Sequence, residues 1–524
     1  MKAKCIMLQG TGSHVGKSVL VAALCRIFLQ DGYRVAPFKS QNMALNSYVT
    51  RDGGEMGRAQ VVQAEAAGLA PSVLMNPVLL KPTGQATSQV IVLGRPVGNY
   101  SAKEYHERYN MTALGVVEES LDQLRSEFES IVIEGAGSPA EVNLQATEIV
   151  NMRIARMADC PVLLVADIDK GGALASVVGT LELLDPADRA RVAGVIINKF
   201  RGDVKLFYPA VEFLEQKTGI PVVGIVPYFQ GFRVQEEDTI PEATLLSGRA
   251  AVDNKIDVAV INLPHISNFT DFDPLEDEPD VQLRYVGKKA KLGNPDLIII
   301  PGSKNTIHDL VYLEKTGLAA AILEQEKRGI PIIGVCGGFQ ILGRELHDPL
   351  HTESDIDRVK GLGLLDMTTT FEPDKITTQV QAEVVGSGPL LDSVKGQPVT
   401  GYEIHMGRSI INSGAVPAFR ITERSSREVD VLDGAVRSDG RVLGTYIHGI
   451  FDNDGFRRHL INLIRENKGW GPLVASDAVT VHEQREKDFN KLADVVRASL
   501  DMDRIYRMME LDPDAKQSRE MGAC

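Results

Sequence analysis

Short apolar runs alternate with amphipathic stretches along most of this chain. Stretches with a helical period lie between most of the runs, the first of them at 17–30. A regular alternation of apolar strands and helices is typical of a mostly parallel sheet with helices on both faces. In the first part of the chain the runs rich in Val and Ile are 4–10, 33–39, 130–137, 161–168, 192–198 and 221–227.

The pattern changes near the middle of the chain. Residues 228–255 are polar, with charges, Pro and Gly and no long apolar period, and this composition predicts a connection between domains. Residues 456–510 have a mainly helical pattern. A second series of predicted strands lies between these segments, at 256–264, 295–302, 331–338 and 441–449.

These patterns predict an α/β protein with two doubly wound, mostly parallel-sheet domains and a helical C-terminal segment. A chain of 524 residues is long enough for two or more separate cores. The expected parts are a first domain at 1–230, a linker at 231–255, a second domain at 256–455 and a mainly helical extension at 456–524.

The amino-acid composition limits the kinds of binding partner and the cellular compartment that we expect. The formal charge of −14 speaks against a broad nucleic-acid or anionic-membrane surface, while a small anionic substrate needs only a few local cations. The five cysteines are scattered and without CxxC spacing, which favours a reducing compartment over a disulfide framework or a zinc site. With no signal-peptide pattern and no apolar run of about 18 residues, we expect a cytoplasmic protein. The sequence gives no oligomeric state.

A glycine-rich turn, "GTGSHVGKS" at 10–18, follows the first predicted strand and precedes a helix. Glycines let backbone N–H groups turn inward, and the helix N-terminus points at an anion, so this turn predicts a phosphate site. Its spacing differs from the common P-loop, because five residues and not four separate the first glycine from the Gly-Lys-Ser. Lys17 would reach the β- and γ-phosphates and the Ser18 hydroxyl would bind Mg²⁺. The predicted ATP-binding residues of the turn are Gly10, Thr11, Gly12, Gly16, Lys17 and Ser18.

Four polar residues end other strands of the first domain, at the edge where ligands collect in open α/β sheets. Glu134, in "IEGAG", is either a Mg²⁺ ligand, direct or through water, or a structural carboxylate. Asp167 and Asp169, in "DIDKGG", are alternatives for holding metal or substrate. Asn198, which ends "GVIIN", either reads the adenine edge or caps its strand.

A second motif, "IIGVCGGFQILG" at 332–343, has the pattern of a thiol nucleophile. Cys336 lies between an apolar strand and a helix, and such a sharp turn exposes its residue while the helix N-terminus favours the thiolate. The N–H of Gly337 could stabilise an oxyanion, with a second N–H from around Gly302 or Ser303 in "PGSKNT". His448, at the end of another strand in "GTYIHGIFDN", is the best candidate base among ten histidines.

These motifs together resemble known enzyme families. The P-loop with "IEGAG" resembles the dethiobiotin-synthetase-like P-loop ligases, and "GVCGGFQILG" with a later strand-end His resembles class I glutamine amidotransferases of the CobB/CobQ type. The pairing in this order is similar to the cobyric acid synthase family, and the similarity covers nearly the whole chain. Further stretches that carry it are "PFKSQNMALNS", "LLKPTGQATSQVIVLGR", "INKFRGD", "IPGSKNT" and "GYEIHMGR".

The resemblance implies a glutamine-hydrolysing ligase that uses ATP and Mg²⁺. It implies amidation of the b, d, e and g carboxylates of adenosylcobyrinic acid a,c-diamide, giving adenosylcobyric acid. Many class I amidotransferases have Glu two residues after the catalytic His, and here that residue is Ile450. Asp452 and Glu403 are the sequence candidates for the missing third member of the site.

The two motifs fit one reaction. ATP would activate a carboxylate as an acyl phosphate, and Cys336 with His448 would release ammonia from glutamine to attack it. The nearest alternative is the a,c-diamide synthase, which applies the same chemistry one step earlier. An alternative of a different class is a partitioning-type ATPase switch, but that switch needs a lysine early in the P-loop, where this chain has Thr11.

Overall fold

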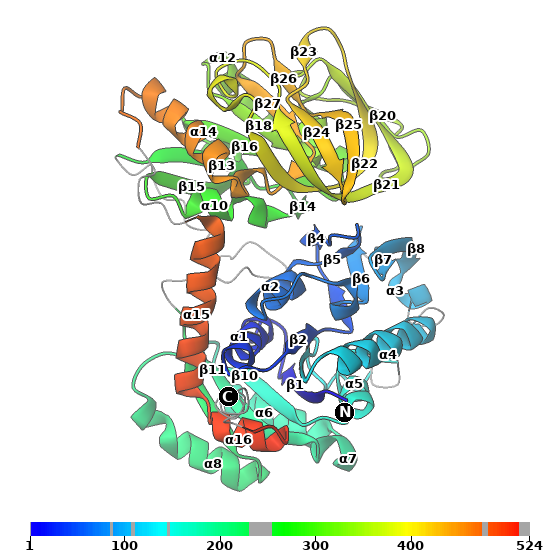
Figure 1. Ribbon diagram of the computed structural model, residues 1–524, viewed down its shortest axis with the longest axis vertical. Coiled ribbons are helices and arrows are strands. Elements are labelled where there is room, and N and C mark those ends of the chain that lie inside the picture. Colours follow the sequence, from blue (N-terminus) through cyan, green and yellow to red (C-terminus); the bar gives the residue numbers. More distant parts are fainter. Residues whose placement is uncertain are drawn as a thin grey trace, which may run out of the picture. The chain divides into compact units, whose positions relative to one another are not determined.

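The computed structural model describes residues 2–83, 87–105, 110–143, 147–229, 254–473 and 480–512 (Figure 1). The chain forms two compact units, each discontinuous in the sequence. The first unit consists of Met1–Ala44, Met56–Glu237 and His482–Cys524, and the second of Leu45–Glu55 and Asp238–Val481. The predicted linker at 231–255 lies outside the described residues except for its last two positions.

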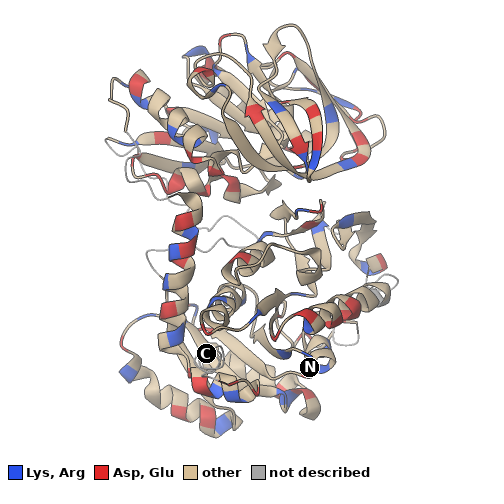
Figure 2. Ribbon diagram, viewed as in Figure 1, with Lys and Arg blue, Asp and Glu red and all other residues tan. Residues whose placement is uncertain are grey.

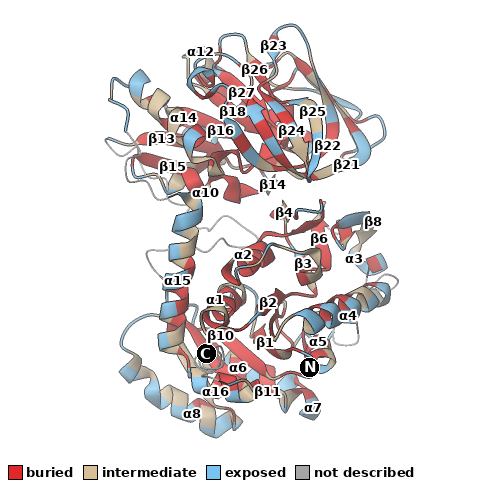
Figure 3. Ribbon diagram, in the orientation of Figure 1, coloured by how far each residue is buried: buried red, intermediate tan, exposed pale blue. Residues whose placement is uncertain are grey.

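A parallel six-stranded sheet is the centre of the first unit. Its strand order is β12-β11-β10-β1-β9-β2, and every neighbouring pair is parallel. The inner strands are almost wholly buried, as Figure 3 shows for β1 and β10, whereas the edge strand β12 is mostly half-buried. The bounds are β1 Lys4–Gly10, β2 Val35–Phe38, β9 Ser130–Glu134, β10 Val162–Asp167, β11 Val192–Phe200 and β12 Val222–Pro227.

Helices and a smaller sheet complete the first unit. The smaller sheet has the order β3-β6-β7-β8, from β3 Gln41–Met43, β6 Val78–Pro82, β7 Thr87–Val92 and β8 Arg95–Ser101. The longer helices are α1 Lys17–Gln30, α2 Arg58–Ala66, α4 Asn110–Glu127, α5 Met152–Ala158, α6 Ala173–Leu183 and α8 Tyr208–Thr218. Short helices are α3 Ala102–Glu104 and α7 Pro186–Arg189.

Two C-terminal helices, α15 (Val481–Ser499) and α16 (Met502–Met508), belong to the core of the first unit. Charged residues recur along α15 in Figure 2, and its few buried residues lie on one side, as expected for an amphipathic helix. Leu500 forms a β-bridge with Gly224 of β12, and Arg497 makes a two-point ion pair with Asp31. The end of the chain therefore stabilises the sheet that begins it.

The second unit also contains a mostly parallel sheet, with the order β15-β13-β16-β18-β27-β26-β23. The five strands from β15 to β27 are parallel, and the last two are antiparallel. The bounds are β13 Ile256–Ile261, β15 Val281–Val286, β16 Leu297–Ile300, β18 Ile332–Val335, β23 Ala415–Val416, β26 Ala435–Arg437 and β27 Val442–Thr445. The helices are α10 Asp273–Glu276, α11 Thr306–Lys315, α12 Leu318–Lys327, α13 Gly337–Leu342 and α14 Asp454–Asn467.

A second, largely antiparallel sheet in this unit was not expected from the sequence pattern. Its order is β20-β19-β21-β22-β28, with β24 also paired to β21 and β25 paired to β24. The long strands β21 and β22 pair over most of their length, and β22 also pairs with the short strand β28. The bounds are β19 Glu345–His347, β20 Arg358–Lys360, β21 Met367–Val384, β22 Pro398–Ile411, β24 Phe419–Arg424, β25 Arg427–Asp433 and β28 Ile447–His448.

The predicted fold class is confirmed: both units are built on mostly parallel sheets with helices, and the C-terminal segment is helical over 454–467, 481–499 and 502–508. Among the residues that the structure describes, none of the helices combines the length and the apolar character that a bilayer crossing requires.

The contact between Gly224 and Leu500 gives a test of the C-terminal helices. A methyl group at Gly224 would overlap Leu500 and the carbonyl oxygen of Ser499, so Gly224→Ala should destabilise the first unit by about 1–3 kcal/mol. Gly179→Ala is the control, because that helical glycine has open space around it and alanine should stabilise α6 by roughly 0.5–1 kcal/mol. Urea denaturation followed by circular dichroism measures both; equal midpoints would contradict this packing.

Candidate functional site

The glycine-rich turn of the first unit has the geometry of a phosphate cradle. Strand β1 ends at Gly10, and α1 begins at Lys17 directly after Gly16, whose φ of 94° favours glycine. A Cβ on Gly16 would also overlap the side-chain amide of Asn198, and one on Gly10 would lie 2.7 Å from the carbonyl oxygen of Gly12. The backbone can therefore turn this tightly only with glycine at both positions.

The Ser18 hydroxyl and the Glu134 carboxylate are brought together as the sequence analysis expected. Ser18 Oγ donates to Glu134 at 2.8 Å. The same carboxylate accepts from Lys39 Nζ at 2.9 Å and from Gln63 Nε2 at 2.5 Å, and Glu134 is only 1% exposed. A buried carboxylate needs such partners because desolvation disfavours its charge. Lys39 and Gln63 were not singled out by the sequence reasoning.

The Asn198 side chain lies against the turn, with one atom left without a partner. Its Nδ2 donates to the carbonyl oxygen of Val15 at 2.8 Å, while its buried Oδ1 has no hydrogen-bond partner among the described residues. The N–H of Thr11 donates to Val165 of β10 at 2.9 Å, so this predicted ATP-binding residue has its amide bonded to the sheet. Lys17 Nζ donates to Gly12 at 3.1 Å.

Asp167 and Asp169, the alternatives for metal or substrate binding, each form an ion pair. Asp167 pairs with Lys199 at 3.0 Å and Asp169 pairs with Arg201 at 2.7 Å. Lys199 Nζ also donates to the carbonyl oxygen of His14 in the glycine-rich turn, at 2.6 Å. Lys199 thus links β11 to the turn, a role that the sequence reasoning missed although "INKFRGD" was noted.

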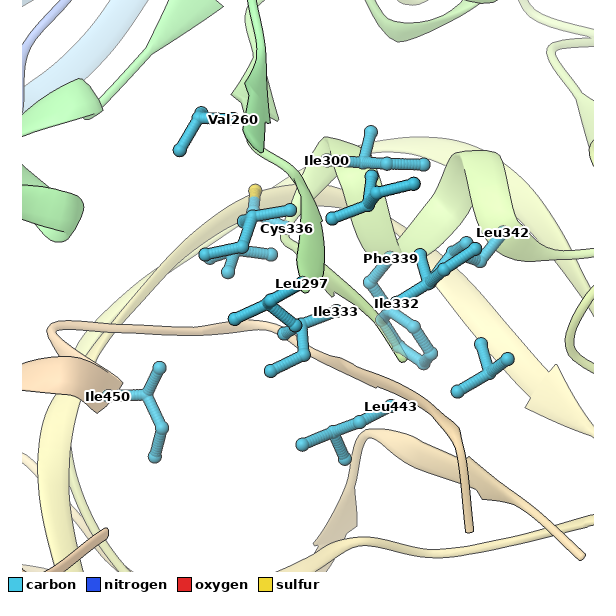
Figure 4. Packing of buried hydrophobic residues seen from close by; sticks show 14 of the residues in the cluster. Val260, Leu297, Ile300, Ile332, Ile333, Cys336, Phe339, Leu342, Leu443 and Ile450 are labelled. Carbon is cyan, nitrogen blue, oxygen red and sulfur yellow. The ribbon is translucent and has the colours of Figure 1, made fainter. Parts of the chain in front are cut away.

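Cys336 occupies a strained turn between β18 and α13. Its φ of 52° and ψ of −110° are rare for a residue with a side chain, and its N–H donates to Thr445 of β27 at 2.8 Å. The turn is tight because a Cβ on Gly338 would overlap the carbonyl oxygen of Ile300. Figure 4 shows Cys336 among the apolar residues of this region, and only 7% of the residue is exposed. The side chain therefore has one fixed position at the N-terminus of α13.

The two glycines proposed for the oxyanion hole lie close to Cys336 and His448. A Cβ on Gly337 would be 2.8 Å from the backbone nitrogen of Ser303, and one on Gly302 would be 3.3 Å from His448 Cε1. Gly302 and Ser303 form β17, which pairs with β14 (Ile266–Ser267). The segment is fixed by Ser303 Oγ, which donates to buried Asp309 at 2.6 Å.

The His448 imidazole has three partners. Its Nδ1 lies 2.6 Å from Asp271 Oδ2, and the N–H of Gly449 donates to the other carboxylate oxygen at 3.1 Å. The Cys336 side chain lies near enough to the imidazole to affect its pKa, while its Sγ donates to the carbonyl oxygen of Ile404 at 3.4 Å. The Tyr402 ring stacks on its face, with centroids 5.3 Å apart and planes at 17°. Asp271 belongs to the 3-10 helix η4 (Phe269–Phe272), and both it and His448 are buried.

Burial and charge oppose each other at His448. Desolvation alone would lower its pKa, but the electrostatic interactions with Asp271 and Cys336 outweigh it and raise the pKa to about 10. His448 is therefore an imidazolium near neutral pH, and this places a cation beside Cys336. Burial raises the pKa of Cys5, Cys25 and Cys160, and Cys524 lies outside the described residues.

The structure corrects the third member of the thiol site. Glu403 pairs with Arg424 through two hydrogen bonds, of 2.8 and 3.0 Å, and lies 3.5 Å from His405. Asp452 lies in η7 (Ile450–Asp452), where its N–H donates to the carbonyl oxygen of Gly449 at 3.0 Å. The carboxylate on the imidazole is that of Asp271, which is 177 residues away in the sequence. Ile450, where many class I enzymes have Glu, is a buried apolar residue.

Comparisons with known proteins find two matched domains along the chain. Residues 6–241 match the CobQ/CobB/MinD/ParA nucleotide binding domain, and residues 257–456 match the CobB/CobQ-like glutamine amidotransferase domain. A cobyric acid synthase from Pelotomaculum thermopropionicum is 56% identical over 97% of both chains. One from Moorella thermoacetica is 57% identical over 97% of this chain and 98% of its own. A solved glutamine amidotransferase from Thermotoga maritima is 16% identical, with a TM-score of 0.27, over 49% of this chain and 98% of its own.

The fold and the two matched domains define the class: an enzyme in which a nucleotide-binding domain is joined to a glutamine amidotransferase domain. Within that class, the identity over nearly the full length decides the family. The chain belongs to the cobyric acid synthase family.

Asp271→Asn tests the corrected site. Without the carboxylate the pKa of His448 should fall, so the thiolate loses its cation near neutral pH and glutamine-dependent turnover should drop roughly 100-fold or more. The alkylation rate of Cys336 by iodoacetamide, measured against pH, should move its midpoint upward. Asp452→Asn serves as the control and should leave both unchanged. If Asp452→Asn and not Asp271→Asn shifts the profile, this assignment is wrong.

Proposed function

We propose that this chain amidates the b, d, e and g carboxylates of adenosylcobyrinic acid a,c-diamide, using ATP and glutamine, to give adenosylcobyric acid in cobalamin biosynthesis. The observation that carries the proposal is the presence, in one chain, of the Ser18–Glu134 pair beside a phosphate cradle and of Cys336 beside the His448–Asp271 pair. The names of the relatives supply the substrate class.

In the amidotransferase domain, the Cys336 thiolate attacks the side-chain amide carbon of glutamine. The N–H groups of Gly337 and of the neighbouring Gly302–Ser303 segment would stabilise the oxyanion, and the closeness of Gly337 to the backbone nitrogen of Ser303 supports this. The His448 imidazolium then gives its proton to the departing nitrogen, and ammonia leaves behind a γ-glutamyl thioester. Neutral His448 next takes a proton from water, which hydrolyses the thioester and restores the thiol. Asp271 holds the ring in place and stabilises its charge throughout.

In the nucleotide-binding domain, the residues fit ATP and Mg²⁺. ATP, when bound, supplies the phosphoryl group that turns a carboxylate into an acyl phosphate open to ammonia. Lys17 would neutralise phosphate charge, and the unpartnered Oδ1 of Asn198 would accept from the adenine amino group. No cluster of three or more His, Cys, Asp or Glu side chains suited to a metal occurs in the described part of the chain, so Mg²⁺ would be held by Ser18, Glu134 and the phosphates.

The product mass tests the regiochemistry. Incubation of the purified chain with ATP, Mg²⁺, glutamine and the corrinoid a,c-diamide should give a product with four added amides by mass spectrometry. If the chain were instead an a,c-diamide synthase, it would add no amides to the a,c-diamide and two amides to cobyrinic acid. The number of amides added to each of these two substrates therefore decides between the two enzymes.

Cys336→Ser separates the two halves of the reaction. The serine hydroxyl fits the space of the thiol, but its pKa is far too high for ionisation beside His448, so glutamine-dependent amidation should be lost. Amidation driven by added ammonium salt, assayed above neutral pH where more ammonia is unprotonated, should remain within about threefold of wild type because the nucleotide site is untouched.

Lys17→Ala is the reciprocal variant. It should abolish amidation from both nitrogen sources, while a glutamine-mimicking electrophile still labels Cys336. If Cys336→Ser, correctly folded, loses the glutamine and ammonia activities equally, the division of labour between the domains is wrong.

A further inference from the structure

A segment from within the nucleotide-binding half of the sequence belongs to the second unit. Residues 45–55, here called the strap, cluster with the amidotransferase domain, although the residues on both sides belong to the first unit and the matched nucleotide-binding region spans 6–241. The strap contains strand β4 (Ser47–Val49) and the start of β5 (Glu55–Gly57), which pair as a small hairpin. Gly53, with a φ of 81°, makes the turn between them.

The strap is fixed to the antiparallel sheet of the second unit by buried polar contacts. Glu55 forms an ion pair with Lys375 of β21, and side chains of both are no more than 5% exposed. Gln379 of the same strand donates to the carbonyl oxygen of Val49. Ser47 Oγ donates to Glu55 at 2.9 Å. Breaking a buried, hydrogen-bonded charge pair is costly, so the strap has a fixed position within this unit.

From this position the strap contacts the start of η4, the element that carries Asp271. The N–H of Ser47 donates to Asn268 Oδ1 at 3.1 Å, and Asn46 Oδ1 accepts from the N–H of Phe269 at 3.2 Å. Asn268 has the left-handed φ of 53°, and its carbonyl oxygen accepts from the N–H of Asp271 at 3.0 Å. The strap therefore holds the turn from which the Asp271 carboxylate is presented to His448.

The strap also contacts Tyr402, the ring that lies on the face of His448. Tyr402 Oη donates to the carbonyl oxygen of Ser47 at 3.4 Å and accepts from Asn268 Nδ2 at 3.3 Å. The rings of Tyr48 and Tyr402 meet edge to face, with centroids 5.0 Å apart. Two of the groups that surround the imidazole, the carboxylate at Nδ1 and the ring on its face, are thus both held by the strap.

We propose that the strap is a positioning element of the glutaminase site: through Asn268 and Tyr402 it fixes the Asp271–His448 pair in its productive geometry. This inference rests on the proposed role of His448 and Cys336 in releasing ammonia. Toward this pair, the contacts of the strap run to Asn268 and Tyr402, so its residues act on the pair as positioning residues. Small displacements of a catalytic pair are expensive for the rate, and fixed supporting contacts prevent them.

Asn268→Gly is the main test, made in the full-length chain. Glycine accepts the left-handed backbone without strain, so the substitution removes the side-chain contacts to Ser47 and Tyr402 and leaves the turn possible. Asn268→Asp keeps the acceptor for the Ser47 N–H and is the conservative variant that should rescue. Tyr402→Phe keeps the ring on His448 and removes only the hydroxyl contacts. Asp52→Asn, in the exposed turn of the strap beside Thr50, is the matched control.

Three measurements separate positioning from a merely structural role. Asn268→Gly should lower kcat for glutamine-dependent amidation about tenfold or more, with KM for glutamine within about threefold of wild type. It should also shift the pH midpoint of Cys336 alkylation upward, because the ionisable groups facing the imidazole are Asp271 and Cys336 and the first would be displaced. Ammonia-driven amidation should stay within about twofold. Tyr402→Phe should show a smaller change in the same direction, and Asp52→Asn none.

Wild-type kcat and an unshifted alkylation profile in Asn268→Gly would overturn the proposal, and so would an equal loss of the glutamine and ammonia activities. If that variant does not fold, an unchanged profile in Tyr402→Phe would overturn it. A failure of the proposed function can be told apart from a failure of the strap proposal. In that case Cys336→Ser, made without any strap substitution, would keep its glutamine-dependent activity.

Discussion

Side chains that end neighbouring parallel strands meet at one edge of a sheet, and both candidate sites depend on this constraint. In the first unit, β1, β9 and β11 end at or near Gly10, Glu134 and Asn198, three residues that lie together at the phosphate cradle. In the second unit, β18 ends just before Cys336, and β27 supplies the carbonyl of Thr445 that fixes its backbone. Strand β1 is followed by α1 and β18 by α13, so a helix N-terminus lies at each candidate site, where it favours negative charge.

The buried charges of the second unit are compatible with folding because each has a partner. His448 and Asp271 are 1% and 4% exposed, and an isolated charge at such a depth would be strongly disfavoured. The carboxylate accepts hydrogen bonds at both oxygens, from the imidazole and from Gly449, so its desolvation is compensated. The same pairing that makes the charges tolerable keeps the imidazole protonated beside Cys336, so one interaction serves both stability and the electrostatics of the candidate site.

The sequence predicted the parts of the fold and site that are local in the chain. Each of these features occupies one short segment: the glycine-rich turn, the turn at Cys336 and the individual parallel strands. Their residue patterns can be recognised without knowledge of the tertiary structure. Asp271 could not be found in this way, because the expected third member was sought within a few residues of His448 or in a nearby motif. Its segment, "NFTDFDP", carries no motif, and only the fold brings η4 to β28. The antiparallel sheet was missed because β21 and β22 alternate buried and exposed residues only over part of their length.

The same limit applies to the strap. Residues 45–55 follow "PFKSQNMA" without any change in composition that would mark a passage to another domain, so a reading in chain order keeps them in the first. The contacts that assign them to the second unit are single polar pairs with residues more than 200 positions away, such as Ser47 with Asn268. The strap is covalently continuous with Ala44 and Met56 of the first unit, although its own contacts lie in the second. The proposed positioning of the Asp271–His448 pair would therefore link the glutaminase site to a segment that lies within the matched nucleotide-binding region of the sequence.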